Sequence, residues 1–220
     1  MIFPKLNDKK CAYVNLNLEA QIWIQNRENS KRGNPLIDPN ICEQFVAEVH
    51  KKYKFDFSYG GYMEDRSVLW KGSYLEKWHT FTHLGIDINA SAGTEIAASF
   101  DFSITKIDND YPEEGGWGPR IIIRHASEPL YFIYAHLDRD IQKKVGERIA
   151  NGQIFAKVGK PPFNGNWFPH LHVQGITAEY FSEIETKNLW SELDGYGLMG
   201  EMELNKTRFP DPTPYIELPS

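Results

Sequence analysis

The sequence predicts a mainly β protein with a compact antiparallel core. From about residue 81 onward, short segments rich in β-branched and aromatic residues alternate with turns that contain Gly, Asn, Asp or Pro. Short strands at such close spacing are typical of antiparallel sheets and sandwiches. We therefore expect three parts: a small α/β extension over residues 1–78, the β core over residues 79–178, and a helix with an extended tail over residues 179–220 that packs on the core.

The N-terminal extension contains one clear helix signal. Residues 1–37 are polar and irregular, and QNRENSKRGNP predicts an exposed loop. A helix should follow, because Asp38 can cap it, Pro39 suits its first position, and apolar residues beyond share one face. It should end near the lysines at positions 51 and 52. The next stretch, KFDFSYGGYMEDRSVLWKGSYL, is broken by Gly-Gly and is more typical of strands and turns.

The core and the tail follow from the same signals. The strands are expected in FTHLGIDI, EIAASF, FSITKI, PRIIIRHA, LYFIYAHL, QIFAKVG and HLHVQGIT. Residues 179–193 predict a helix, because apolar side chains such as Phe181 and Ile184 form a stripe. The tail RFPDPTPYIELPS is too rich in proline for a helix or a central strand, so we expect it to lie extended across the surface.

Composition limits the classes of function. The chain has 220 residues, of which 41% are hydrophobic, and a formal net charge of −6. An acidic balance argues against a nucleic-acid binder, since phosphate recognition requires a basic face. No apolar run approaches the roughly 18 residues of a membrane span. The sequence leaves the oligomeric state open.

The redox and cellular compartment also stay open. Cys11 and Cys42 are the two cysteines of the chain, and they could form one disulfide or remain free thiols. The start, MIFPKLNDKK, has no apolar segment of signal-peptide length. We therefore expect a chain that is cytosolic, already trimmed, or exported without a classical signal.

Three short motifs gather histidines. In HLGID, a strand would place His83 and Asp87 on one face, with Gly85 leaving space between them and the neighbouring apolar side chains in the core. In HLH, His170 and His172 would likewise share a face. In YAHL, His136 shares a face with the tyrosine at position 134. Taken singly, these motifs also fit a surface His–Asp hydrogen bond or simple aromatic packing.

Taken together, the motifs predict a catalytic zinc site. Such a site needs three protein ligands, one open position for water, and a proton-transfer group nearby. His83, Asp87 and one histidine of the HLH pair can supply the ligands. The other histidine of that pair and His136 can transfer protons. The remaining histidines at positions 50, 79 and 125 are interpreted as helix-end, rim and turn residues.

The order and spacing of the motifs resemble the lysostaphin-type, or LytM-like, zinc metallopeptidases. The resemblance covers about residues 81–178 and is carried by HLGIDINASAGTEIAAS, IIIRH, YFIYAHL, VGERIANGQIFAKVG and PHLHVQ. It implies a compact antiparallel β fold with a groove across the sheet and one Zn²⁺ at its floor. Residue by residue, it implies His83, Asp87 and His172 as the metal ligands, and His136 and His170 as the catalytic histidines.

The resemblance further implies an endopeptidase of bacterial peptidoglycan stems or cross-bridges. The alternatives are a non-catalytic LytM-like regulatory or binding module, and a zinc hydrolase of another peptide or amide. Before HLH, many members of the family have a short Gly/Ser/Thr-rich turn that ends in Gly-Pro, whereas this chain has PPFNGNWFPHLH. The added bulk of Trp167 and Phe168 would either line the substrate groove or only pack the loop. We place Asn166 and Trp167 along the groove, together with Tyr134 of YAHL. The segment 55–78, with its aromatic residues, would form a wall of the groove, cover the groove in a latent state, or add a strand to the sheet.

Overall fold

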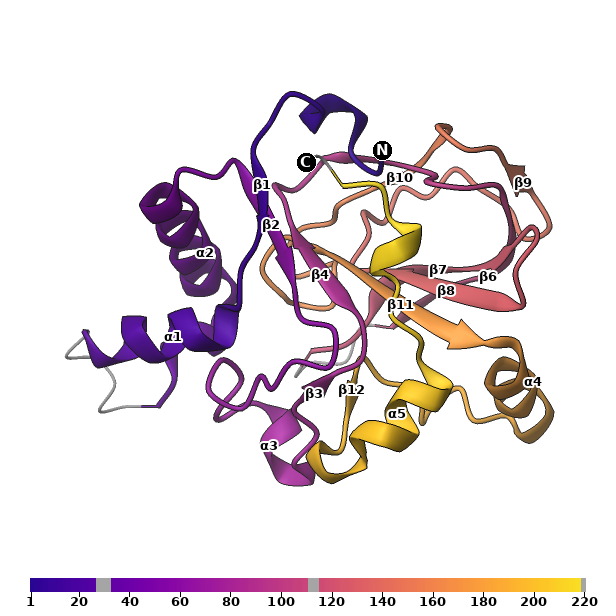
Figure 1. Ribbon diagram of the computed structural model, residues 1–220. Helices are drawn as coiled ribbons and strands as arrows, with labels where there is room; N and C mark the ends of the chain where they lie inside the picture. Colours follow the sequence, from indigo (N-terminus) through magenta and orange to yellow (C-terminus); the bar gives the residue numbers. More distant parts are fainter. Residues whose placement is uncertain (27–32, 111–114, 219–220) are drawn as a thin grey trace.

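The computed structural model describes residues 1–26, 33–110 and 115–218 (Figure 1). Within them, the fold is built on an eight-stranded sheet with the order β1-β2-β4-β11-β8-β7-β6-β9. Its strands are β1 (Cys11–Tyr13), β2 (Phe57–Gly60), β4 (Ile86–Asn89), β11 (Leu171–Thr177), β8 (Leu130–Ala135), β7 (Gly118–His125), β6 (Phe102–Asp110) and β9 (Arg148–Ile149). Neighbours pair antiparallel, except that β1 and β2 are parallel. The predicted mainly β, antiparallel fold class is confirmed.

Two small sheets complete the β structure. One pairs β5 (Glu95–Ala97) with β10 (Ile154–Lys157), and the other pairs β3 (Thr82–His83) with β12 (Tyr196–Gly197). Each of the seven core segments expected to be strands therefore contains one. The exception to simple strand geometry is FTHLGIDI, which is divided between β3 and β4.

The large sheet separates two apolar layers. In the first layer, on one face of the sheet, side chains such as Ile121, Phe132 and Val173 are buried together with Ile96 of β5 and Phe155 of β10. The second layer, on the opposite face, is a smaller cluster. It contains Ile122, Ile133, Ala135, Ile176, Phe181, Ile184, Leu193 and Phe209, among others. Alternating side chains of one strand thus enter different layers, as the pleat of a sheet requires.

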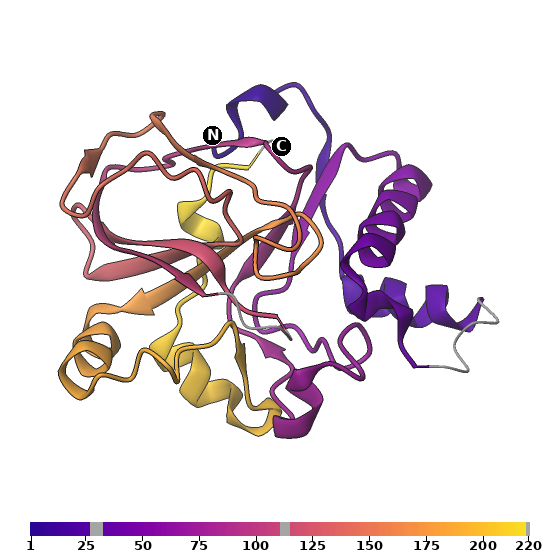
Figure 2. The same cartoon turned by 180° about the vertical axis from the view of Figure 1, so that it is seen from behind.

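The helices lie around the edge and the second face of the sheet. They are α1 (Leu16–Gln25), α2 (Pro39–Tyr53), α3 (Tyr74–Trp78), α4 (Ala178–Lys187) and α5 (Met202–Arg208). In Figures 1 and 2, α1 and α2 lie outside the β1–β2 edge, in indigo and purple. The helix predicted to follow Asp38 is confirmed as α2. Asp38 accepts hydrogen bonds from the backbone of Asn40 and Ile41, and Pro39 is the first residue of the helix.

The extension is more ordered than the sequence suggested. The polar stretch 1–37 was expected to be irregular, but it contains β1, α1 and two short 3₁₀ turns, Pro4–Leu6 and Pro35–Ile37. Asn15 caps α1 by accepting a hydrogen bond from the backbone of Leu18. The loop expected over QNRENSKRGNP lies largely outside the described residues.

The C-terminal part confirms one prediction and modifies another. The helix expected over 179–193 forms as α4, and it ends at Lys187. The tail contains a 3₁₀ turn, Thr213–Tyr215, and it buries Phe209 and Ile216 in the two apolar layers. Near its end, the carbonyl of Glu217 accepts a hydrogen bond from the backbone of Ile2. The tail is thus part of the packed fold as well as of the surface.

Two further sequence questions are settled by the described residues. Both cysteines are free thiols, Cys11 half-buried and Cys42 buried. No helix among the described residues is long and apolar enough to cross a membrane.

Candidate active site

Three strands bring the predicted metal ligands together. His83 lies on β3, Asp87 on β4 and His172 on β11, where Asp87 and His172 are directly opposite each other. The expectation of a single continuous strand through His83 and Asp87 was wrong, because the chain bends at Gly85. Consequently Leu84 is buried in the second layer.

The bend also explains why position 85 is a glycine. A Cβ there would lie 2.4 Å from the carbonyl oxygen of Val173 and 2.9 Å from Nε2 of His172. The space expected between the two polar side chains is therefore filled by the His172 ring. A larger residue at position 85 would displace this ligand.

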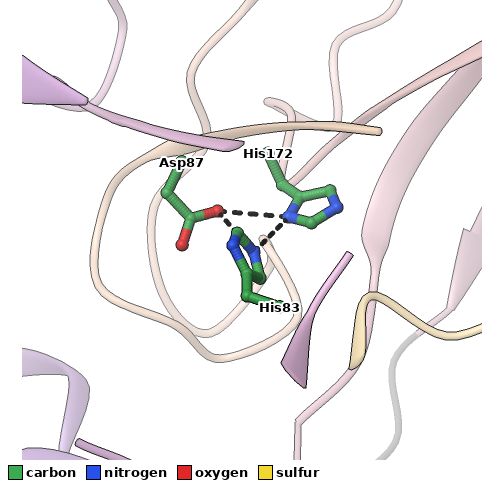
Figure 3. A group of neighbouring side chains, drawn as sticks. All are labelled: His83, Asp87 and His172. Carbon is green, nitrogen blue, oxygen red and sulfur yellow. Dashed lines mark hydrogen bonds and ion pairs between the residues drawn. The ribbon is translucent and has the colours of Figure 1, made fainter. Parts of the chain in front are cut away.

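The ligand atoms form a tight, buried cluster (Figure 3). One atom from each of His83, Asp87 and His172 lies within 4.8 Å of the others. His83 Nε2 is 3.0 Å from His172 Nδ1, and Asp87 Oδ1 is 3.3 Å from the former and 3.1 Å from the latter. Each residue has a relative exposure of 2% or less. Buried polar side chains need partners, and a metal ion is one partner that all three could share.

Their outer neighbours decide which atoms carry protons. Nδ1 of His83 donates to the carbonyl of Gly61 at 3.0 Å, so its Nε2 keeps a lone pair. Nε2 of His172 donates to Oε1 of Gln174 at 3.1 Å, so its Nδ1 keeps a lone pair. The orientation of the Gln174 amide is in turn set by its Nε2, which donates to the carbonyl of Asp194. Two lone pairs and a carboxylate oxygen therefore converge, a donor set that fits a divalent metal ion.

The charge states suit metal binding. Burial raises the pKa of Asp87, but the surrounding histidines outweigh it and hold this pKa well below its usual value. Burial lowers the pKa of His83 to about 4. At neutral pH the cluster thus consists of an ionised carboxylate with a neutral His83, which are the forms that coordinate metals.

His136 and His170 lie side by side next to the cluster. Their ring centroids are 4.4 Å apart, and Nε2 of His170 is 3.5 Å from Oδ1 of Asp87. Each donates its Nδ1 proton to a backbone carbonyl, His136 to Asn164 at 2.9 Å and His170 to Phe168 at 2.7 Å. Burial lowers the pKa of both rings. Both are therefore neutral, with an Nε2 lone pair able to accept a proton.

His136 reaches this position through an unusual backbone conformation. It directly follows the end of β8 and has a φ of +60°, in the left-handed region. This conformation breaks the alternation of the strand, so His136 and Tyr134 do not share an environment. Tyr134 is fully buried in the first layer, with its ring 5.2 Å from that of Phe155. The prediction that Tyr134 lines the groove was wrong.

A cleft of about 520 Å³ opens onto these residues. Its floor includes Asp87, His136, His170 and His172. Its walls include side chains from all three parts of the chain: Trp70, Tyr74, Asp110, Trp117, Trp167, Trp190, Leu193, Asp194 and Tyr196. The walls are thus mainly aromatic, and much of them comes from outside the core.

Of the other groove residues, one reaches the cleft. Trp167 lines it and donates its indole N–H to the carbonyl of Gly116 at 2.9 Å. Asn166 is exposed and borders a neighbouring depression beside Trp78. Trp167 also belongs to the apolar cluster beneath α2, with Trp70 and Phe168, so it packs the loop and lines the cleft at once.

The segment 55–78 contributes one wall of the cleft. Trp70 and Tyr74 line it, whereas Tyr59 and Tyr62 pack against the first apolar layer. The ring of Tyr196 lies 5.1 Å from that of His83 at an interplanar angle of 44°. The turn role expected for His125 is confirmed, because its Nδ1 accepts from the backbone of Ser127 and Glu128.

Sequence reasoning missed the polar groups behind the ligands. Gln174 continues the alternation of HLHVQ, and that spacing could have identified it. Glu64 and Arg66 are both buried beside Asp87, and they lie in a stretch without a recognisable motif. Asp194 and Tyr196 follow the last predicted helix, where sequence gave no sign of a return to the site.

Comparison with known proteins matches the segment that contains the five histidine and aspartate residues of the site. Peptidase family M23 matches the chain over residues 81–180. An uncharacterized metalloprotease of Haemophilus influenzae is 29% identical over 92 residues, which are 42% of this chain and 18% of that protein. The chain thus spans about a fifth of that relative's length.

Solved structures of similar proteins match part of the chain. LytU is 30% identical, with 44% of this chain and 63% of that one covered and a TM-score of 0.38. The catalytic domain of lysostaphin from Staphylococcus simulans is 23% identical, with 62% and 86% covered and a TM-score of 0.43. The motifs of the sequence and the match over residues 81–180 agree, and this segment of the chain belongs to Peptidase family M23, as the resemblance to lysostaphin-type enzymes implied.

Proposed function

We propose that this protein is a zinc-dependent endopeptidase that cleaves peptide bonds in bacterial peptidoglycan stems or cross-bridges. The observation that carries the proposal is the arrangement at the floor of the cleft. Three buried ligand atoms converge there, and two neutral histidines lie beside them with Nε2 lone pairs. A binding module would need neither the converging lone pairs nor the second pair of histidines.

The residues divide the chemistry between them. A zinc ion held by His83, Asp87 and His172 would supply a Lewis acid that lowers the pKa of water to about 7 and polarises the scissile carbonyl. Of His136 and His170, one accepts the water proton at Nε2, since the carbonyl on its Nδ1 fixes that tautomer. The proton taken from water is then delivered to the leaving amine, either by the same histidine or through the other ring. That other ring gains a donating Nε2–H, which can also stabilise the developing oxyanion, only after it has received the proton. The lowered pKa values of the two histidines favour the proton-accepting form at neutral pH.

The cleft supports a peptide substrate. Its lining includes Trp70, Tyr74, Trp117, Trp167, Trp190 and Tyr196, and aromatic side chains provide large contact areas for a bound peptide. The choice of peptidoglycan rests on the resemblance to the lysostaphin-type family, whose usual substrates are the peptide stems and cross-bridges of peptidoglycan. No other substrate class is favoured by a specific contact.

The proposal is tested by mass spectrometry of muropeptides after zinc-loaded protein has been incubated with purified peptidoglycan. We expect new peptide termini at one type of bond, absent with a His136→Asn variant. Binding to peptidoglycan without new termini would identify a non-catalytic module. Cleavage of other peptides alone would refute the peptidoglycan substrate and leave the peptidase.

A further inference from the structure

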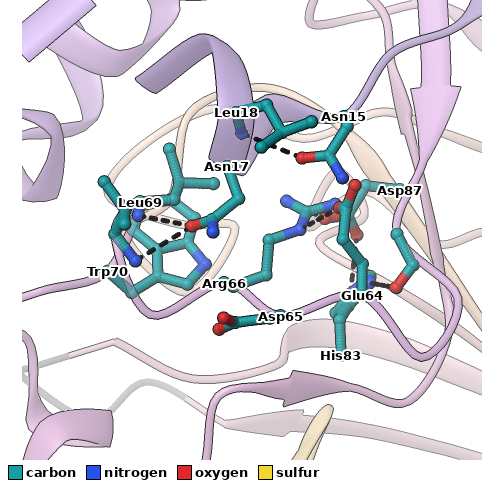
Figure 4. Close-up of polar contacts among 12 residues, drawn as sticks. Asn15, Asn17, Leu18, Glu64, Asp65, Arg66, Leu69, Trp70, His83 and Asp87 are labelled. Carbon is teal, nitrogen blue, oxygen red and sulfur yellow. Dashed lines mark hydrogen bonds and ion pairs between the residues drawn. The ribbon is translucent and has the colours of Figure 1, made fainter. Parts of the chain in front are cut away.

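A buried ion-pair network lies directly behind the metal ligands and comes from the N-terminal extension (Figure 4). Arg66 has a relative exposure of 1%, and its Nε is 2.5 Å from Oε2 of Glu64. Its Nη1 is 3.5 Å from Oδ2 of Asp87. Arg66 therefore stands between two carboxylates, one of which belongs to a metal ligand.

The two oxygens of Asp87 have different partners. Oδ1 faces the ligand atoms of His83 and His172, while Oδ2 faces Arg66. A carboxylate held in this way presents one chosen oxygen to a metal and cannot freely exchange it for the other. Hydrogen-bonded or ion-paired neighbours of ligands commonly set their orientation.

Gly61 links this network to a second ligand. Its carbonyl accepts the Nδ1 proton of His83. A Cβ on Gly61 would lie 2.3 Å from Nη2 of Arg66 and 2.4 Å from Nδ1 of His83, and its φ is +110°. A side chain at position 61 would thus collide with both Arg66 and His83. The position of His83, and through Arg66 that of Asp87, therefore depends on this one turn.

The segment from Gly61 to Leu69, which carries Glu64 and Arg66, is fixed near both ends. Toward the core, the backbone of Met63 donates to His83 at 2.8 Å, and the backbone of His83 donates to Glu64 at 2.9 Å. Toward α1, the side-chain oxygen of Asn17 accepts from the backbone of Val68 and Leu69, both at 2.9 Å. This segment cannot move without breaking several buried or part-buried hydrogen bonds.

We propose that Arg66 is a positioning residue for the metal centre, with Glu64 balancing its charge, so that the extension outside residues 81–180 completes the site. The inference rests on the proposed zinc centre. Arg66 fixes which oxygen of Asp87 coordinates, and Glu64 balances the charge of the guanidinium so that the guanidinium does not repel the metal. The planar guanidinium is required because it reaches both carboxylates at once.

The test compares zinc affinity with apo-protein stability in the full-length chain. Zinc dissociation constants are measured by competition with a chromogenic chelator, and melting temperatures are measured on metal-free protein. Arg66→Met should weaken zinc binding about 10- to 100-fold. It should also lower the melting temperature, because Glu64 is left buried without its cation.

The double variant Arg66→Met with Glu64→Gln separates positioning from stability. It removes one positive and one negative charge, so the net charge is unchanged. We expect the apo melting temperature to recover most of its loss while zinc affinity stays weakened. Arg66→Lys keeps the charge and the fold but lacks the fork, so it too should weaken zinc binding.

A matched control is Arg120→Met, which removes another buried arginine, paired with Asp108 rather than with a ligand. Zinc affinity should then be unchanged. Wild-type zinc affinity in Arg66→Lys and in the double variant would overturn the inference and leave the proposed function intact. A wild-type chain that binds no zinc would overturn both.

Discussion

His136 and His170 face each other across a ring separation of 4.4 Å, and each gives its Nδ1 proton to a backbone carbonyl. The group of side chains whose ligand atoms lie within 4.8 Å of one another is His83, Asp87 and His172, so both imidazoles border this cluster without belonging to it. Two neutral rings with free Nε2 atoms beside three ligands are the arrangement expected of a metal-assisted hydrolase with separate proton-transfer groups.

Substitution of His136 should remove catalysis and spare the metal. We expect His136→Ala to retain zinc and to lose about 10²- to 10⁴-fold in kcat, the usual contribution of a general acid–base group. Because position 136 is left-handed, with a φ of +60°, His136→Asn is the matched variant that tolerates this backbone. Turnover and zinc content measured on the same samples check the prediction. Loss of zinc from His136→Asn would mean that His136 is a ligand.

Substitution of His172 should have the opposite signature. His172→Ala removes one of three ligands, so both zinc and activity should be lost. His125→Ala is the control, because His125 serves a turn outside the cleft. Elemental analysis after dialysis against chelator-treated buffer measures the effect. A His172→Ala protein with full zinc content would disprove the ligand assignment.

Substitution of Gly85 should disturb both the fold and the metal site. The added methyl group of Gly85→Ala meets the Val173 carbonyl and the His172 ring, and such overpacking costs about 1–3 kcal/mol. We expect a lower unfolding free energy in denaturant and weaker zinc binding. Gly200→Ala is the control, since a Cβ there has no neighbour within 4 Å. Equal effects of the two substitutions would contradict the close approach at position 85.

Substitution of Tyr134 tests the corrected role of this residue. Its hydroxyl is buried and has no hydrogen-bond partner among the described residues, and burial raises the pKa of the phenol. Tyr134→Phe should leave activity unchanged and preserve or raise stability, by up to about 1–3 kcal/mol if the full cost of the unpaired hydroxyl is recovered. Thermal unfolding and turnover check this. A large rise in KM would return Tyr134 to the substrate groove.

Much of the fold and the ligand set could be predicted because they are local in the sequence. Alternation places His170 and His172 on one face, and capping by Asp38 starts α2 where expected. The spacing of HLGID identified two residues that do meet. The path of the backbone between His83 and Asp87 could not be predicted, because the bend at Gly85 depends on contact with β11, which is distant in the sequence.

The remaining errors have the same physical origin. Tyr134 was assigned to the groove by strand alternation, which the left-handed backbone of His136 interrupts. Arg66 could not be recognised, because a charged residue in an irregular segment is normally exposed and its partner Asp87 is distant in the sequence. The helix α1 was missed since its apolar face packs against α2 and a loop rather than on the sheet.

The central claim is tested most directly by anomalous diffraction at the zinc edge from crystals of the zinc-loaded protein. We predict one peak roughly 2.0–2.2 Å from Nε2 of His83, Oδ1 of Asp87 and Nδ1 of His172, with His136 and His170 outside the coordination sphere. A peak elsewhere, or one in which His136 or His170 occupies the fourth position, would contradict the account.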